Sequence, residues 1–69
     1  MKPDFTIYTL PDCKWCSKAK QLLTLFNFTY EEINEKYPDF PTVPYIIKGE
    51  TPVGGFTELA AYCRTLKFQ

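Results

Sequence analysis

The organisation of the chain follows from a change of pattern within one segment, Phe5-Thr6-Ile7-Tyr8-Thr9-Leu10-Pro11-Asp12-Cys13-Lys14-Trp15-Cys16. Its first six residues are mostly β-branched or aromatic, which is typical of a strand, and Pro11-Asp12 is typical of a turn. From Cys13 onward the apolar residues return at helical spacing: Cys16, Ala19, Leu22, Leu23 and Phe26. We therefore predict a strand, a turn and a helix, with Asp12 as the N-cap and Asn27 as the C-terminal stop.

The remaining sequence predicts three further strands and a second helix. Residues 28–33 and 43–48 have strand character, and a short strand surrounds Pro52, which belongs at a sheet edge because proline cannot donate to a ladder. Gly54-Gly55 ends this strand, and a helix follows over 56–66 with Thr57 as its N-cap. Residues 34–41 hold at most one helical turn, because Pro38 and Pro41 interrupt it. The order is βαβ followed by ββα, and the strand-helix-strand unit implies a right-handed parallel crossover.

Length and composition restrict the class of protein. Sixty-nine residues form one domain, 1–69, and a composition of 45% hydrophobic and 17% aromatic residues is that of a folded chain. Eight basic residues balance eight acidic ones, which gives no reason to expect a nucleic acid as partner. The sequence has neither an apolar run of membrane-spanning length nor a secretory signal, so we expect a soluble, cytoplasmic protein.

Cys13-Lys14-Trp15-Cys16 is the motif that carries chemistry. Two cysteines three residues apart on a helix share one face, at a separation that a disulfide can bridge. Cys13 lies at the helix N-terminus, where free N–H groups and the neighbouring Lys14 favour the thiolate and lower the pKa of Cys13. Cys16 lies one turn further in and is expected to be more buried. This asymmetry suits thiol–disulfide exchange, in which an exposed thiolate attacks and a second thiol resolves the mixed disulfide.

Other interpretations of these residues stay open. A zinc site would need two more ligands, but the chain has no histidine and one further cysteine, Cys63, so we expect no metal. Two incidental core cysteines are a second alternative. Trp15 is either a half-buried core residue or an exposed apolar platform for a substrate. Cys63 matches the apolar side of the last helix as a small core residue, with a regulatory thiol as the alternative. We interpret the other aromatic residues as core or surface cover: Phe5, Phe26, Phe28, Phe40, Tyr45 and Phe68.

The chain resembles a glutaredoxin along essentially its whole length. The residues that carry the resemblance run in family order: Ile7-Tyr8-Thr9, Cys13-Lys14-Trp15-Cys16, Ala19-Lys20, Leu22-Leu23, Thr42-Val43-Pro44 and Gly54-Gly55-Phe56-Thr57-Glu58-Leu59. The resemblance implies an α/β protein with the thioredoxin-like fold in a minimal glutaredoxin form. That fold has a four-stranded mixed sheet flanked by helices, with helices on both faces.

The resemblance also implies the site. Cys13 and Cys16 would be the catalytic pair, and Val43–Pro44 a cis peptide beside them whose free backbone groups pair with a substrate strand. The glutathione-binding residues would be Lys14, Trp15, Thr42, Val43, Pro44, Gly55, Phe56 and Thr57. No residue would bind a metal ion. The start of the last helix would hold a carboxylate of glutathione. Leu10 stands where many glutaredoxins have a lysine.

The function expected from this resemblance is glutathione-dependent reduction of protein disulfides or glutathione mixed disulfides. Glutathione would serve as reducing co-substrate, with no bound cofactor, and the protein would act as a monomer. One alternative is a redoxin that thioredoxin reductase reduces and that donates electrons to ribonucleotide reductase. Another is a glutaredoxin that binds a [2Fe–2S] cluster through Cys13 and glutathione.

Overall fold

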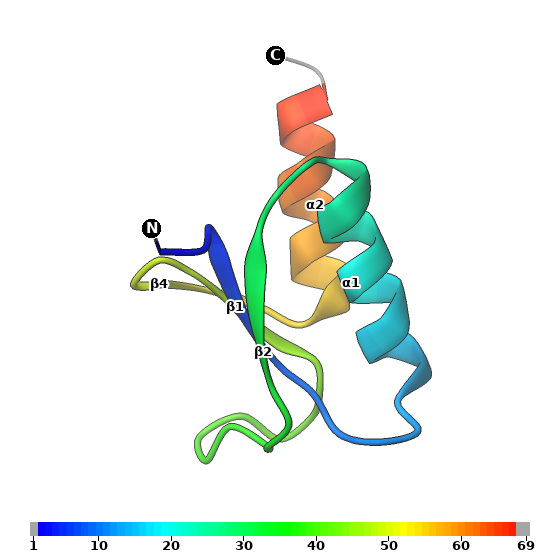
Figure 1. Ribbon diagram of the computed structural model, residues 1–69, viewed down its shortest axis with the longest axis vertical. Coiled ribbons are helices and arrows are strands. Elements are labelled where there is room, and N and C mark those ends of the chain that lie inside the picture. Colours follow the sequence, from blue (N-terminus) through cyan, green and yellow to red (C-terminus); the bar gives the residue numbers. More distant parts are fainter. Residues whose placement is uncertain (1, 68–69) are drawn as a thin grey trace.

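The computed structural model describes residues 2–67 and shows four strands and two helices in the expected order (Figure 1). The elements are β1 (Phe5–Tyr8), α1 (Lys14–Leu25), β2 (Tyr30–Ile33), β3 (Tyr45–Lys48), β4 (Thr51–Gly54) and α2 (Phe56–Lys67). The first three strands are shorter than expected: β1 ends two residues early, whereas β2 and β3 each begin two residues late. Phe68, which we interpreted as an aromatic covering residue, lies outside the described residues.

The four strands form one mixed sheet in the order β2-β1-β3-β4. β1 pairs parallel with β2, as the strand-helix-strand crossover predicts, and antiparallel with β3, which in turn pairs antiparallel with β4. β4 is an edge strand, which confirms the position predicted for Pro52. The thioredoxin-like fold with a four-stranded mixed sheet is therefore confirmed.

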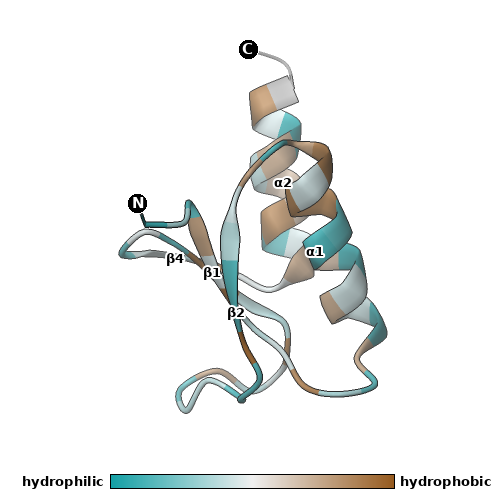
Figure 2. Ribbon diagram, viewed as in Figure 1, coloured by the Kyte–Doolittle hydropathy of each residue, from teal (hydrophilic) through white to brown (hydrophobic). Residues whose placement is uncertain are grey.

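Both helices pack on the same face of the sheet (Figure 1). Alternate residues of β1, Phe5 and Ile7, point to this face and are almost completely buried, together with Ile46 of β3. The helices contribute the other members of the core, which are Ala19, Leu23, Leu59 and Cys63. Figure 2 shows hydrophobic and hydrophilic bands along both helices, as expected for helices with one buried side.

The other face of the sheet is covered by aromatic side chains rather than by a helix. Tyr8 and Tyr45 are paired across β1 and β3 on this face. From the loop between β2 and β3, Tyr37 packs on Tyr45 with ring centroids 4.5 Å apart, and Phe40 packs on Tyr45 at the same distance. The expectation of helices on both faces is wrong for residues 2–67, because the prolines at 38 and 41 keep this loop irregular.

Within residues 2–67, neither α1 nor α2 combines the length and the apolar character that a membrane-spanning helix requires.

Candidate active site

The two cysteines of the Cys-x-x-Cys motif are joined by a disulfide at the start of α1. Their Cα atoms are 5.2 Å apart. Cys16 lies inside the first turn and has only 2% of its surface exposed, whereas Cys13 is half-buried at the helix end. Solvent therefore reaches Cys13 more easily than Cys16, which is the asymmetry predicted from the sequence.

Cys13 is the N-cap residue of α1, and the prediction that Asp12 has this role is wrong. Asp12 has a φ of 60° and forms the turn, so its backbone does not lead into the helix. Cys13 has the extended backbone of an N-cap, and its Sγ accepts a hydrogen bond of 3.1 Å from the N–H of Cys16. The helix thus directs one of its free N–H groups at this sulfur. At the other end of α1, Asn27 follows the last helical turn with a φ of 62°, as predicted for the C-terminal stop.

The segment before β3 lies against the disulfide. The Val43–Pro44 peptide bond is cis, as the resemblance implied, and Pro44 is buried. The carbonyl oxygen of Val43 lies 3.9 Å from Sγ of Cys13. This contact joins residues 30 positions apart in the sequence and places the backbone before β3 next to the more accessible sulfur.

A cleft of about 240 Å³ opens beside this proline, and we call it the proline cleft. Its walls come from the start of α1, the loop before β3 and the start of α2: Trp15, Phe40, Thr42, Val43, Pro44, Gly55, Phe56, Thr57 and Glu58. Seven of the eight residues expected to bind glutathione lie in this one cleft. The eighth, Lys14, lies outside it.

Trp15 forms a wall of the proline cleft and is not part of the core. Its side chain is 52% exposed, and its ring packs on Phe56 with centroids 5.2 Å apart. Nζ of Lys18 lies 5.0 Å from the centroid of the indole ring, within the range of a cation–π interaction. Of the two interpretations of Trp15, the structure therefore favours the exposed platform.

The start of α2 is capped from inside the helix. The helix begins at Phe56, so the prediction of Thr57 as its N-cap is wrong. Oε1 of Glu58 accepts a hydrogen bond of 2.7 Å from the N–H of Gly55, which is the arrangement of a capping box without a cap side chain. Gly54 has a φ of 121°, and a Cβ atom built there would lie 2.9 Å from Cγ of Glu58. Glycine is therefore required at position 54 both by the backbone and by the close approach of Glu58.

A second cleft, of about 560 Å³, lies on the other side of the cysteines, and we call it the polar cleft. It is lined by Thr9, Leu10, Pro11, Asp12, Cys13, Lys14, Cys16, Ser17, Lys20, Glu32 and Asn34. The hydroxyl of Thr9, a buried residue, donates a hydrogen bond of 2.7 Å to Oε2 of Glu32, and Nζ of Lys20 lies 3.1 Å from the same oxygen. The Thr9 hydroxyl, and then Lys20, lower the pKa of Glu32 below its ordinary value.

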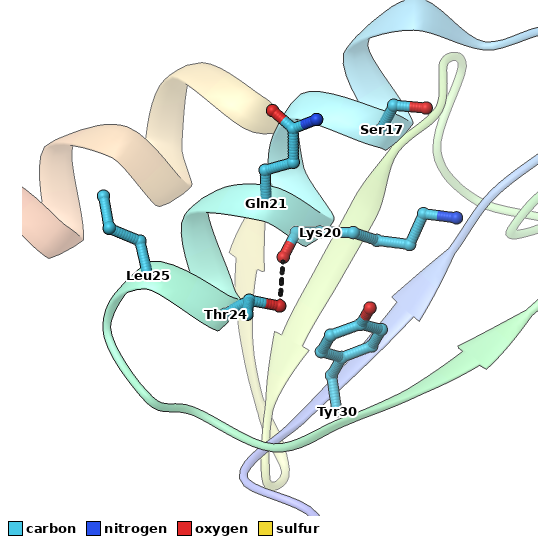
Figure 3. Close-up of a pocket in the computed structure, with 6 residues that line it drawn as sticks. All are labelled: Ser17, Lys20, Gln21, Thr24, Leu25 and Tyr30. Atoms are coloured by element: carbon cyan, nitrogen blue, oxygen red, sulfur yellow. Dashed lines mark hydrogen bonds between the residues drawn. The ribbon is translucent and has the colours of Figure 1, made fainter.

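A third cavity, of about 440 Å³, lies along the outer side of α1 and β2. Figure 3 shows its six residues, with the hydroxyl of Thr24 donating to the backbone carbonyl of Lys20 at 3.0 Å. This bond stays within one helix, and no cysteine lines the cavity. We therefore exclude it from the candidate site.

Cys63 lies in the core, in the cluster that also contains Leu23 and Leu59. It forms no disulfide, and burial raises the pKa of its thiol. This agrees with the interpretation of Cys63 as a small core residue. Residues 2–67 contain no group of three or more cysteine, aspartate or glutamate side chains that are placed to hold a metal ion.

Among the residues of the two clefts that the sequence analysis missed are Phe40, Glu32 and Glu58. Phe40 lies within the irregular loop between β2 and β3, so no periodicity indicates where its ring lies. Glu32 alternates with its neighbours on a strand and resembles any solvent-facing residue. Glu58 did have a signal, because a glutamate three residues after a helix-starting glycine matches the second half of a capping box.

The geometry agrees with comparisons to known proteins. A model of the glutaredoxin family matches residues 5–34, while a comparison with curated proteins finds no significant match. The solution structure of glutaredoxin from Brucella melitensis is 31% identical, with a TM-score of 0.79 over 97% of this chain and 85% of that one. The crystal structure of glutaredoxin 1 from Francisella tularensis, complexed with cacodylate, is 27% identical, with a TM-score of 0.77 over 94% of this chain and 96% of that one.

A third structure supports the fold alone. The holo form of glutaredoxin C1 from Populus tremula x tremuloides has a TM-score of 0.80 at 18% identity, over 96% of this chain and 79% of that one. The two bacterial glutaredoxins resemble this protein in both sequence and fold. In this protein, a disulfide at the start of a helix lies beside a cis-proline. This chain therefore belongs to the glutaredoxin family of thiol–disulfide oxidoreductases.

Proposed function

We propose that the protein reduces protein disulfides and glutathione mixed disulfides, with Cys13 as the nucleophile, Cys16 as the resolving thiol and glutathione as the reductant. The observation that carries this proposal is the N-cap position of Cys13, whose sulfur accepts the N–H of Cys16. The same N–H stabilises a thiolate, which is the reactive form in exchange. Lys14, the next residue, adds positive charge at the rim of the polar cleft.

The reaction proceeds through two exchanges. The Cys13 thiolate attacks one sulfur of the substrate disulfide, forms a mixed disulfide and releases the other sulfur as a thiolate, which takes up a proton. Cys16 then loses its proton and attacks Sγ of Cys13. The second substrate thiolate leaves, and the Cys13–Cys16 disulfide forms. Two glutathione molecules, attacking in succession, return the pair to the dithiol and leave as glutathione disulfide.

The proline cleft supports glutathione as the reductant. The N–H groups of Phe56 and Thr57 belong to the first turn of α2, where unpaired amides favour a carboxylate. The backbone at Thr42 and Val43 borders the same cleft, so an extended tripeptide can pair with it while its sulfur approaches Cys13. Trp15, whose ring packs on Phe56, adds an apolar wall to this cleft.

The reductant is tested with NADPH-coupled assays on the oxidised protein. With glutathione and glutathione reductase we expect NADPH oxidation that depends on the protein, and with thioredoxin reductase alone we expect none. The reverse pattern would assign the protein to the thioredoxin reductase pathway. Reduction by glutathione also implies a compartment rich in this thiol, and we propose the cytoplasm. Ribonucleotide reductase is one protein substrate whose disulfide can be tried in these assays.

The roles of the two cysteines are tested with Cys16→Ser. This variant should still remove glutathione from a glutathionylated peptide, because that route needs only Cys13 and free glutathione. It should lose the reduction of an intramolecular protein disulfide, which needs the resolving thiol. Cys63→Ser is the matched control with both cysteines of the motif intact, and it should retain both activities.

A further inference from the structure

The proline cleft contains one charged side chain among its nine lining residues, the carboxylate of Glu58. The other eight are aromatic or aliphatic residues, threonines and a glycine. Lys14 lines the polar cleft instead, and Lys18 lies over the indole ring of Trp15 without lining the proline cleft. The cleft that receives the substrate therefore carries a negative charge of its own.

This carboxylate is held in place. Oε1 of Glu58 accepts a hydrogen bond from the N–H of Gly55 at 2.7 Å, and a Cβ atom built at Gly54 would lie 2.9 Å from Cγ of Glu58. Oε2 takes no part in that hydrogen bond. A substrate segment that approaches Cys13 along Val43 enters the same cleft as this fixed charge.

Aromatic rings form the other walls of the proline cleft. Trp15 packs on Phe56, and Phe40 contributes a third ring from the loop before β3. Aromatic faces attract Lys and Arg through their ring quadrupole and also pack against the apolar stems of these side chains. Three rings and one carboxylate together suit a cationic side chain.

We propose that Glu58 is a specificity-determining residue that selects disulfide substrates with a lysine or arginine beside the reacting cysteine and disfavours those with aspartate or glutamate. The inference rests on the proposed function, because it concerns which substrates reach Cys13. Glu58 acts on the recognition of the substrate and takes no part in the exchange of sulfur bonds.

The experiment uses three peptides that each contain one intramolecular disulfide and no glutathione, so that their own side chains can enter the proline cleft. They are identical except for the residues on both sides of each cysteine, which are lysine, glutamine or glutamate. We expect kcat/KM to fall in that order, with a spread of about fivefold between lysine and glutamate at low ionic strength. The spread should lie mainly in KM and should shrink at high salt, because exposed charges are screened.

Glu58→Gln keeps an acceptor for the Gly55 N–H and removes the charge, so it should bring the three peptides to nearly equal rates. Glu50→Gln is the matched control, since it removes an exposed carboxylate in the turn between β3 and β4, outside the cleft, and should keep the spread. If Glu58→Gln does not fold, the salt dependence of the unaltered protein with the lysine and glutamate peptides decides the question.

Equal rates for the lysine and glutamate peptides with the unaltered protein would overturn the inference, as would a spread that persists in Glu58→Gln. In both cases turnover of the glutamine peptide leaves the proposed function standing. Failure to reduce any of the three peptides would overturn the proposed function and this inference with it.

Discussion

The two clefts on either side of the disulfide differ in how their polar groups are satisfied. In the polar cleft, the hydroxyl of Thr9 and the ammonium group of Lys20 both donate to the carboxylate of Glu32, so these three groups are already paired. In the proline cleft, the first turn of α2 and the backbone before β3 line a space with aromatic walls. This contrast separates the two clefts: the larger one, which Cys13 and Cys16 themselves line, has its carboxylate already paired, while the smaller one is suited to receive a peptide.

The largest effect is expected from Trp15→Ala in the proline cleft. Removing the exposed indole takes away the ring that packs on Phe56, and large aromatic anchors dominate binding at such surfaces. We expect KM for a glutathionylated peptide to rise about tenfold, which corresponds to ~1.4 kcal/mol, with a smaller change in kcat.

Leu25→Ala is the matched control for Trp15→Ala. Leu25 is 76% exposed at the far end of the same helix and lines neither cleft beside the cysteines. Steady-state kinetics of both variants checks the prediction. An unchanged KM in Trp15→Ala would remove the indole from the binding surface.

A comparable effect, on stability instead of binding, is expected from Gly54→Ala, directly before Gly55 of the proline cleft. The φ of 121° is unfavourable for alanine, and the new Cβ would press on Cγ of Glu58 at 2.9 Å. We expect a loss of about 1–2 kcal/mol in the free energy of unfolding, measured by urea denaturation. Gly49→Ala has open space around it and a φ of 61°, so it should cost less, and equal losses would contradict the role given to the Glu58 contact.

The smallest effect is expected from Glu32→Gln in the polar cleft. The hydrogen bond from Thr9, followed by the contact with Lys20, lowers the pKa of Glu32 in the folded chain. The charged carboxylate therefore stabilises the fold above its pKa in the unfolded chain, and this stabilisation is lost as the pH falls through the lower pKa of the folded state.

Because the Lys20–Glu32 pair is partly exposed, we expect Glu32→Gln to cost about 0.5 kcal/mol at pH 7. The difference from the unaltered protein should shrink below about pH 4.3, which urea denaturation across pH values measures. KM for a peptide should not change. A rise in KM instead would mean that the polar cleft also binds substrate, and the contrast between the clefts would no longer hold.

Much of the fold could be predicted because it depends on local pattern. The apolar spacing after Cys13 identifies α1, and the proline in Thr51–Gly54 places that strand at an edge. The two helix starts were misassigned, since Asp12 and Thr57 are good caps by residue type, while the backbone angles decide which residue caps. Those angles depend on the turn before each helix, which residue type alone does not specify.

The candidate site divides in the same way. The position of Cys13 and Cys16 follows from a motif at a strand-to-helix turn. The residues expected in the proline cleft before β3 and at the start of α2 came from the resemblance to glutaredoxins. The place of Phe40 depends on the path of the loop between β2 and β3, where two prolines replace the helix expected on that face. The network of Thr9 with Glu32 depends on the pairing of β1 with β2, which brings together residues 23 positions apart.

The central claim is that the start of α1 holds Cys13 as a thiolate. The most direct test is the rate of alkylation of Cys13 by iodoacetamide as a function of pH, in reduced Cys16→Ser, where the only other thiol is the buried Cys63. We predict that the midpoint lies clearly below the value of about 8.5 for a free cysteine. A midpoint at or above that value would contradict the account.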